Sequence, residues 1–163
     1  MWSEIWATIV AEFSDISDLA DAVRISLRLL VAALLGAIIG LEREWKSKNA
    51  GVRTHMLVAV GSALFMIGPM QAGIGVGDMS RVIQGVVQGV GFLGAGAIII
   101  GTAQQRTRGL TTAAGVWAAA GIGVAAGLGM EMTAVLSTVI VLFILTLLPY
   151  FTSTKAVDDV DRE

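Results

Sequence analysis

The chain has no cysteine, a single histidine and few charged residues. The absence of cysteine excludes disulfides, thiolate metal sites and cysteine nucleophiles. Because His55 is the only histidine, one chain cannot build a site from several histidines. Charged residues make up 15% of the sequence, whereas soluble domains carry about a quarter. Residues 1–14 are acidic where a signal peptide needs a basic region, so we expect no cleavable signal peptide.

Long apolar runs are abundant instead. Hydrophobic residues make up 55% of the 163 residues, and the mean hydropathy is +0.79. A helix rises about 1.5 Å per residue and needs about 20 apolar residues to cross roughly 30 Å of hydrocarbon. The sequence therefore predicts an all-α integral membrane protein with one transmembrane domain over residues 23–151. The five expected spans are 23–41, 56–77, 82–101, 110–130 and 132–151.

The two ends of the chain differ from its apolar centre. Residues 1–22 interleave Trp2, Trp6 and other apolar side chains with acids, which predicts an amphipathic interfacial helix docked on the bundle. Residues 152–163 form a polar tail. With five spans, one membrane side carries eight of the 11 Lys and Arg residues, namely Arg43, Lys46, Lys48, Arg53, Arg106, Arg108, Lys155 and Arg162. The positive-inside rule then predicts an external N-terminus and a cytoplasmic C-terminus.

Glycine is common in the apolar runs, and it supports two interpretations. Residues 89–94 match G-x-G-x-x-G, but a dinucleotide fold also needs a strand, a helix and an acid about 20 residues later. No acid occurs between Asp78 and Glu131. The alternative is close helix packing in lipid through G-x-x-x-G pairs, which occur at Gly36/Gly40, Gly73/Gly77, Gly85/Gly89 and Gly123/Gly127. We therefore expect a tightly packed glycine-rich bundle, with Gly36, Gly40, Gly85, Gly89, Gly91, Gly94 and Gly96 as packing residues.

Ionisable residues beside apolar runs are the first functional candidates in a membrane bundle. Arg28 lies in the first span, so it must snorkel outward or find a carboxylate. Glu42, Asp78 and Glu131 are the carboxylates near the bilayer. The expected topology separates Glu42 from the other two, so a closed Mg²⁺ cage within one chain is not expected, although a symmetric dimer could pair Glu42 with its copy. The alternative is a structural ion pair such as Glu42 with Arg53.

Three segments resemble the signature blocks of the MgtC/SapB family of bacterial inner-membrane proteins. They are GAIIGLEREWKSKNAGVRTHMLVAVGSAL (36–64), DMSRVIQGVVQGVGFLGAGAI (78–98) and RGLTTAAGVWAAAGIGVAAGLG (108–129). The motifs G-L-E-R, G-x-R-T-H, G-F-L-G-A-G and G-L-T-T-A-A follow one another in that order. The similarity covers residues 25–150.

The resemblance implies a protein connected with magnesium homeostasis, acid tolerance and, in pathogens, survival inside macrophages. The family's best-known members are described as restraining the F1Fo ATP synthase. The chain has Thr111 where the virulence branch has Asn, and Ala118 where that branch has Cys. It is expected to be a short form that lacks the C-terminal cytoplasmic domain. Neither G-x-x-x-x-G-K-[ST] nor D-K-T-G is present, so we expect no ATP hydrolysis and no enzyme.

Two hypotheses about function stay open. The first is a non-enzymatic regulator that packs against another membrane protein, with ATP synthase as the candidate. The second is an ion pathway or sensor for Mg²⁺, K⁺ or H⁺, formed by a homodimer. The expected partners are the lipid bilayer and a second copy, without nucleic acid. No cofactor is expected; Mg²⁺ is the one alternative considered, with Glu42 as its candidate ligand. The functional candidates are Glu42, Arg43, Arg53, Thr54, His55, Asp78, Arg81, Gln84, Arg108, Thr111, Thr112 and Trp117.

Overall fold

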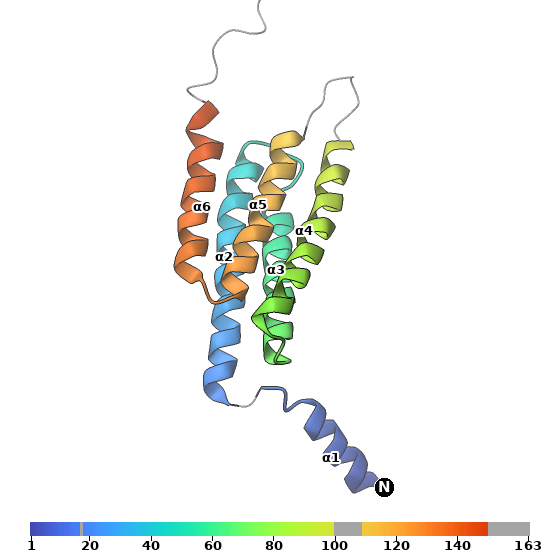
Figure 1. Cartoon of the computed structure of the whole chain (residues 1–163). Coiled ribbons are helices and arrows are strands. Elements are labelled where there is room, and N and C mark those ends of the chain that lie inside the picture. The colour runs from blue at the N-terminus through green and yellow to red at the C-terminus, as the bar shows by residue number, and fades with distance from the viewer. Residues whose placement is uncertain (17, 100–108, 150–163) are drawn as a thin grey trace, which may run out of the picture.

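The computed structural model describes residues 1–16, 18–99 and 109–149, which form six α-helices and no strand (Figure 1). Four of these helices, α2 to α5, are long and apolar enough to cross a membrane. The last helix, α6, has 16 residues, or about 24 Å at 1.5 Å per residue. Four described helices therefore reach the length of the hydrocarbon core. The fifth expected span, 132–151, continues beyond the last described residue, so the number of five spans stays a prediction. The elements are α1 (Trp2–Glu12), α2 (Leu19–Trp45), α3 (Val52–Gln71), α4 (Val76–Ile99), α5 (Leu110–Gly127) and α6 (Glu131–Thr146).

The connection between α2 and α3 is shorter than the sequence predicts. The expected spans 23–41 and 56–77 leave residues 42–55 between them, but α2 continues to Trp45 and α3 begins at Val52. Helix α3 starts early because Gly51 is its N-cap residue and the Val52 N–H donates to Glu44 Oε2 at 3.1 Å. This hydrogen bond satisfies one of the free donors at the start of the helix.

The connection between α3 and α4 lies earlier in the chain than predicted. The turn occupies residues 72–75, where Gly73 adopts a φ of +74° that favours glycine. Asp78 lies between the expected spans 56–77 and 82–101, but the structure places it in the first turn of α4, where an acid interacts favourably with the helix N-terminus. Because α3 ends at Gln71, Pro69 lies in its last turn.

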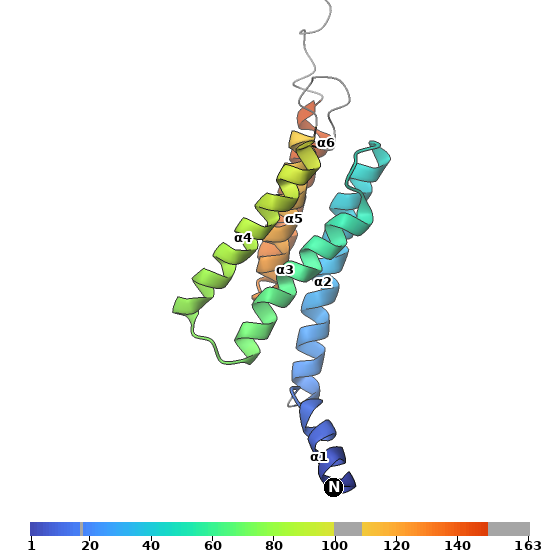
Figure 2. The same ribbon diagram turned by 90° about the vertical axis from the view of Figure 1, so that its right-hand side faces the viewer.

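The N-terminal helix α1 stands apart from the bundle. It has no buried residue and makes no contact with another described helix. Both views show it extending beyond the end of α2 (Figure 1, Figure 2). The predicted docking of residues 1–22 on the bundle is therefore wrong. The helix ends at Glu12, and α2 starts with Asp18 as its N-cap, which accepts from the Asp21 N–H at 2.7 Å.

Helix α5 lies at the centre of the bundle and contacts α2, α3, α4 and α6 (Figure 1, Figure 2). Alanine and glycine dominate its sequence. Small side chains let neighbouring backbones approach closely in a membrane, where no hydrophobic effect drives helices together. Within its apolar window 56% of the residues are buried, against 17% for α4. The composition of α5 therefore matches its central position.

Two glycine pairs hold α3 at close range. A Cβ at Gly36 of α2 would lie 2.7 Å from a backbone carbonyl oxygen of α3, and Gly40 is equally restricted. On α5, a Cβ at Gly123 would collide with the carbonyl oxygen of Ala59, and one at Gly127 would lie 2.6 Å from another α3 carbonyl oxygen. Helix α3 therefore packs between α2 and α5, and only glycine fits at these four positions of α2 and α5.

The glycines of α4 are placed differently. A Cβ added at Gly85, Gly89, Gly91 or Gly96 would meet nothing within 4 Å, and one at Gly94 would make ordinary contact with α5. The cause is the face that α4 turns to the bundle, since Met79, Val86 and Val90 are its buried apolar residues. These glycines were predicted to pack helices closely. Among the described residues they do not.

Candidate functional site

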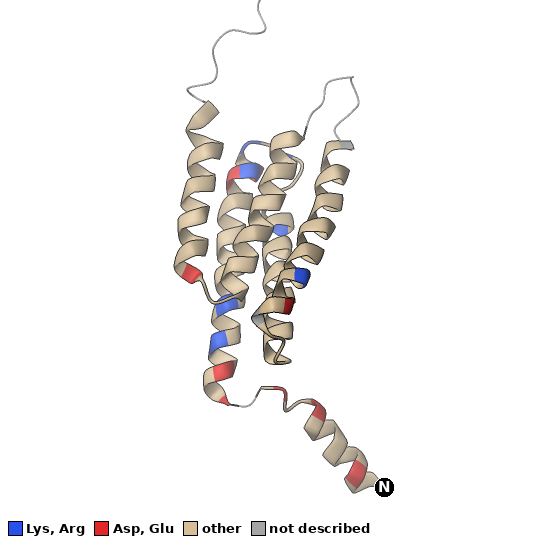
Figure 3. Ribbon diagram, in the orientation of Figure 1, with Lys and Arg blue, Asp and Glu red and all other residues tan. Residues whose placement is uncertain are grey.

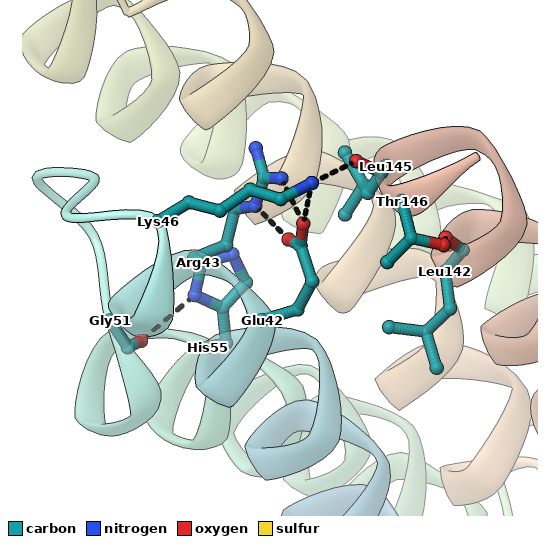
Figure 4. Close-up of polar contacts among 8 residues, drawn as sticks. All are labelled: Glu42, Arg43, Lys46, Gly51, His55, Leu142, Leu145 and Thr146. Carbon is teal, nitrogen blue, oxygen red and sulfur yellow. Dashed lines mark hydrogen bonds and ion pairs between the residues drawn. The ribbon is translucent and has the colours of Figure 1, made fainter. Parts of the chain in front are cut away.

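The charged residues of the bundle form two groups, one at the α2–α3 connection and one toward the other end of the helices (Figure 3). At the α2–α3 connection, Glu42 and Arg43 are both buried in the last turn of α2, with 6% and 2% of their surfaces exposed. Glu42 accepts from Arg43 Nε, from Arg43 Nη2 at 2.6 Å, and from Lys46 Nζ at 2.7 Å (Figure 4). Two cations therefore neutralise one buried carboxylate.

Glu42 forms a structural ion pair, but with Arg43 and Lys46 and not with Arg53, the example that the sequence suggested for this alternative. Because α2 continues to Trp45, Lys46 lies four residues after Glu42 on the same helix face, the favourable spacing for an ion pair. Arg53 lies in the first turn of α3 and is exposed. Lys46 Nζ also donates to the Leu145 carbonyl oxygen of α6 at 2.7 Å. The same lysine thereby links α2 to the end of α6, where carbonyl groups lack helical donors.

His55 is fully buried in the first turn of α3, next to this cluster (Figure 4). Its Nδ1 lies 2.9 Å from the Gly51 carbonyl oxygen. A carbonyl only accepts, so Nδ1 carries the proton in this bond. The other ring nitrogen, Nε2, has no hydrogen-bond partner. It faces Gly115 of α5, where an added Cβ would lie 3.3 Å away, so Gly115 provides space for the ring.

At the other end of the bundle, Arg28 finds the carboxylate that its position requires. Its Nη1 donates to the Gly127 carbonyl oxygen at 3.1 Å, and its Nε lies 4.0 Å from Glu131 Oε1. Asp78 and Arg81 form a separate exposed pair at 3.8 Å. The carboxylates singled out by the sequence thus lie in three different places. No group of three Asp, Glu or His side chains that could hold a metal ion forms within residues 1–16, 18–99 and 109–149.

The polar sequence candidates are spread over the bundle rather than gathered. Thr54 is exposed and lines an apolar pocket of about 350 Å³. Thr111 is exposed while Thr112 is buried, and Gln84 is exposed on α4. Trp117 is half-exposed and lines a pocket of about 220 Å³ against α4. Arg108 lies outside the described residues.

A groove between α3 and α4 is a large hollow of the described structure, and sequence reasoning missed it. It encloses about 690 Å³ and is almost wholly apolar. Gly61, Ser62 and Phe65 line it from α3, and Gly85 and Gly89 line it from α4. A signal was available, because Gly61 and Ser62 are small residues in the middle of an apolar span.

Ser62 is the one polar residue of this groove. Only 3% of its surface is exposed, and its hydroxyl has no hydrogen-bond partner among the described residues. The buried side-chain atoms without a partner in the described structure are Arg28 Nε and His55 Nε2, so the Ser62 hydroxyl opens into the groove and is available to a polar group that enters it. The groove therefore combines an apolar wall with one unused hydrogen-bonding group.

Comparison with known proteins places the chain among membrane proteins of related sequence. The model of the MgtC family matches residues 29–154. Protein SrpB of Synechococcus elongatus is 46% identical over 108 residues, which are 60% of this chain and 59% of that protein. Protein MgtC of Salmonella typhimurium is 45% identical over 116 residues, 71% of this chain and 48% of that protein.

A third relative is the Escherichia coli protein named "Putative magnesium transporter YhiD". It is 44% identical over 99 residues, 56% of this chain and 45% of that protein. The chain thus spans roughly half the length of the curated relatives it matches, from 45% to 59%. No solved structure matches.

Proposed function

This chain belongs to the MgtC family, and on that premise we propose that it is a non-enzymatic regulator in bacterial magnesium or acid adaptation. It acts in the inner membrane, with its C-terminus in the cytoplasm, by docking a helix of another membrane protein. The F1Fo ATP synthase is the candidate partner, because the resemblance to regulators of that enzyme suggests it. The name of one relative supports the connection with magnesium.

The observation that carries this proposal is the one-sided packing of α4. Its buried residues pack in one cluster with Val116 and Ala120 of α5, while Gly85 and Gly89 border an apolar groove of about 690 Å³. Bare glycines on a membrane helix permit the close approach of a second backbone. A surface of this kind suits recognition between helices.

The ionisable residues give less support to a catalytic role. Glu42 is held by Arg43 and Lys46, and Arg28 is held by Gly127 and Glu131. A general acid or base needs a carboxylate or imidazole that can reach a substrate. The buried charges of the described structure are instead engaged with one another.

The test of the regulatory role is a bulky substitution in the groove. Gly89→Leu fills the approach path on α4, whereas Val87→Leu changes the same helix on its other side. In inverted membrane vesicles that hold both proteins, the wild type is expected to reduce ATP-driven proton pumping and to retain ATP synthase in affinity capture. Gly89→Leu is expected to lose both effects, and Val87→Leu to keep them. Pumping and capture that stay unchanged in Gly89→Leu would contradict the proposal.

A second candidate function, an ion pathway or ion sensor, rests on the cluster around His55. Its buried Nε2 lacks a partner, and the His55 side chain lies beside the buried pair Glu42 and Arg43 (Figure 4). A ligand that binds only the folded protein raises its thermal stability. Millimolar Mg²⁺ that stabilises the wild type but not Glu42→Gln would favour this candidate. Proteoliposomes without Mg²⁺, K⁺ or H⁺ flux under any gradient would remove the pathway.

A further inference from the structure

We propose that the groove between α3 and α4 receives α4 of a second copy of this chain, so that two copies pair around a two-fold axis. The inference rests on the proposed function in one respect, because both use the same groove for helix docking. The inference adds the identity of the helix that fills the groove when no other protein is bound. A partner protein would then have to displace the second copy.

The shape of the groove suits a helix with small residues. On α4, Gly85 and Gly89 are separated by one helical turn, and neither has an atom within 4 Å of the Cβ that it lacks. Gly61 on the opposite wall is equally open. In a two-fold dimer the same patch meets itself, so each α4 presents a bare face and receives one. Backbones can then approach as closely as α3 approaches α5 at Gly123.

The chemistry of the groove argues for a polar occupant and against lipid alone. The Ser62 hydroxyl lies in the wall of the groove without a hydrogen-bond partner, although Ser62 is 97% buried. An acyl chain offers neither a donor nor an acceptor. A helix that carries polar side chains can supply the missing group.

Helix α4 itself carries such side chains. Gln84 and Gln88 are exposed on it, and neither amide makes a hydrogen bond within the described residues. Unpaired amides are unfavourable in hydrocarbon. An amide holds both donors and an acceptor, so it can pair with its own copy or with Ser62 of the partner. The groups that the groove lacks and the groups that α4 offers are therefore complementary.

The start of α4 is also complementary to itself in charge. Asp78 and Arg81 are 71% and 84% exposed at their side chains and only loosely paired, at 3.8 Å. In a two-fold pair of α4 helices, each acid can meet the arginine of the other copy. Such pairing favours the correct register between the helices. A second copy is thus complementary to this surface in shape, in hydrogen-bonding groups and in charge.

Disulfide trapping tests the proposal directly, because the chain has no native cysteine. Gly89→Cys and Leu93→Cys place a thiol in the groove, and Val87→Cys is the matched control. Val87 is 44% exposed and lies about 160° around the helix from Gly89. After oxidation in native membranes, both groove variants are expected to run at twice the monomer mass on a non-reducing gel. The control is expected to stay monomeric.

Each alternative result has a defined meaning. Trapping of Val87→Cys to the same extent as the groove variants would indicate random collision and would overturn the dimer. A covalent adduct between Gly89→Cys and a thiol of another membrane protein, without self-trapping, would overturn the dimer but leave the docking function standing. No adduct of either groove variant, together with proton pumping that Gly89→Leu leaves unchanged, would overturn both.

A second test measures the mass of the protein and needs no cysteine variant. In lipid nanodiscs the mass of the wild type is expected to equal two chains, and Gly89→Leu is expected to halve it. Val87→Leu is expected to leave the mass unchanged. Since a Cβ at Gly89 meets no atom of its own chain, this variant is expected to fold. A monomeric wild type would overturn the dimer.

Discussion

Helices α4 and α5 are both rich in glycine, yet their surroundings are opposite. On α5, Gly123 and Gly127 contact the backbone of α3 so closely that no side chain fits. On α4, Gly85 and Gly89 have the same spacing and face open space. A G-x-x-x-G pair therefore marks a helix face that permits close approach. It does not tell whether the approaching helix belongs to the same chain.

The largest loss of stability is expected from a bulky side chain on the glycine face of α5, which packs against the backbone of α3. Gly123→Leu forces a side chain into the carbonyl oxygen of Ala59, and overpacking costs about 1 to 3 kcal/mol, or more where backbone must move. We expect the variant to lose the folded bundle. Gly121→Leu is the control on the same helix, because a Cβ there meets nothing within 4 Å. The measurements are membrane accumulation and the thermal midpoint in mild detergent. Equal stability of the two variants would refute the contrast between closed and open faces.

A smaller loss of stability is expected at the ion pairs, which are buried at Glu42 and Arg43 and exposed at Asp78 and Arg81. Glu42→Gln leaves Arg43 buried beside Lys46 without a carboxylate, and breaking a buried pair costs on the order of 3 kcal/mol. Asp78→Asn removes half of an exposed pair, which contributes at most about 1 kcal/mol. Chemical denaturation in detergent measures both. If Asp78→Asn proved as damaging as Glu42→Gln, burial would not be the factor that separates the two clusters.

The smallest effect is expected at the wall of the open groove. Ser62→Ala removes a hydroxyl that has no partner within the chain, so the stability of the monomer should not fall. A hydrogen bond between membrane helices contributes about 0.6 kcal/mol on average, which is roughly a threefold change in the dimer dissociation constant for each bond lost. Energy transfer between labelled copies in nanodiscs measures it. Dissociation that does not change would exclude a role of this hydroxyl in pairing.

Part of the site was predictable from local sequence and part was not. The burial of charge near Glu42 and Arg43 follows from their place beside an apolar run. The partners of Glu42 were not predicted, since helix α2 was expected to end before it and Arg53 was named only as an example. Once α2 continues, the spacing to Lys46 decides the pair. The need of Arg28 for a carboxylate was predictable, but its match with Glu131 depends on how α5 and α6 return beside α2.

The sequence by itself determined that this is a helical membrane protein of the MgtC family, because span length and motif order are properties of the chain alone. It also determined where glycines permit close contact. Only the tertiary structure decided that α3 fills the glycine faces of α2 and α5 while α4 keeps its own face open. The physical reason is that helical periodicity specifies which residues share a face, whereas the partner of that face depends on the packing of all the helices.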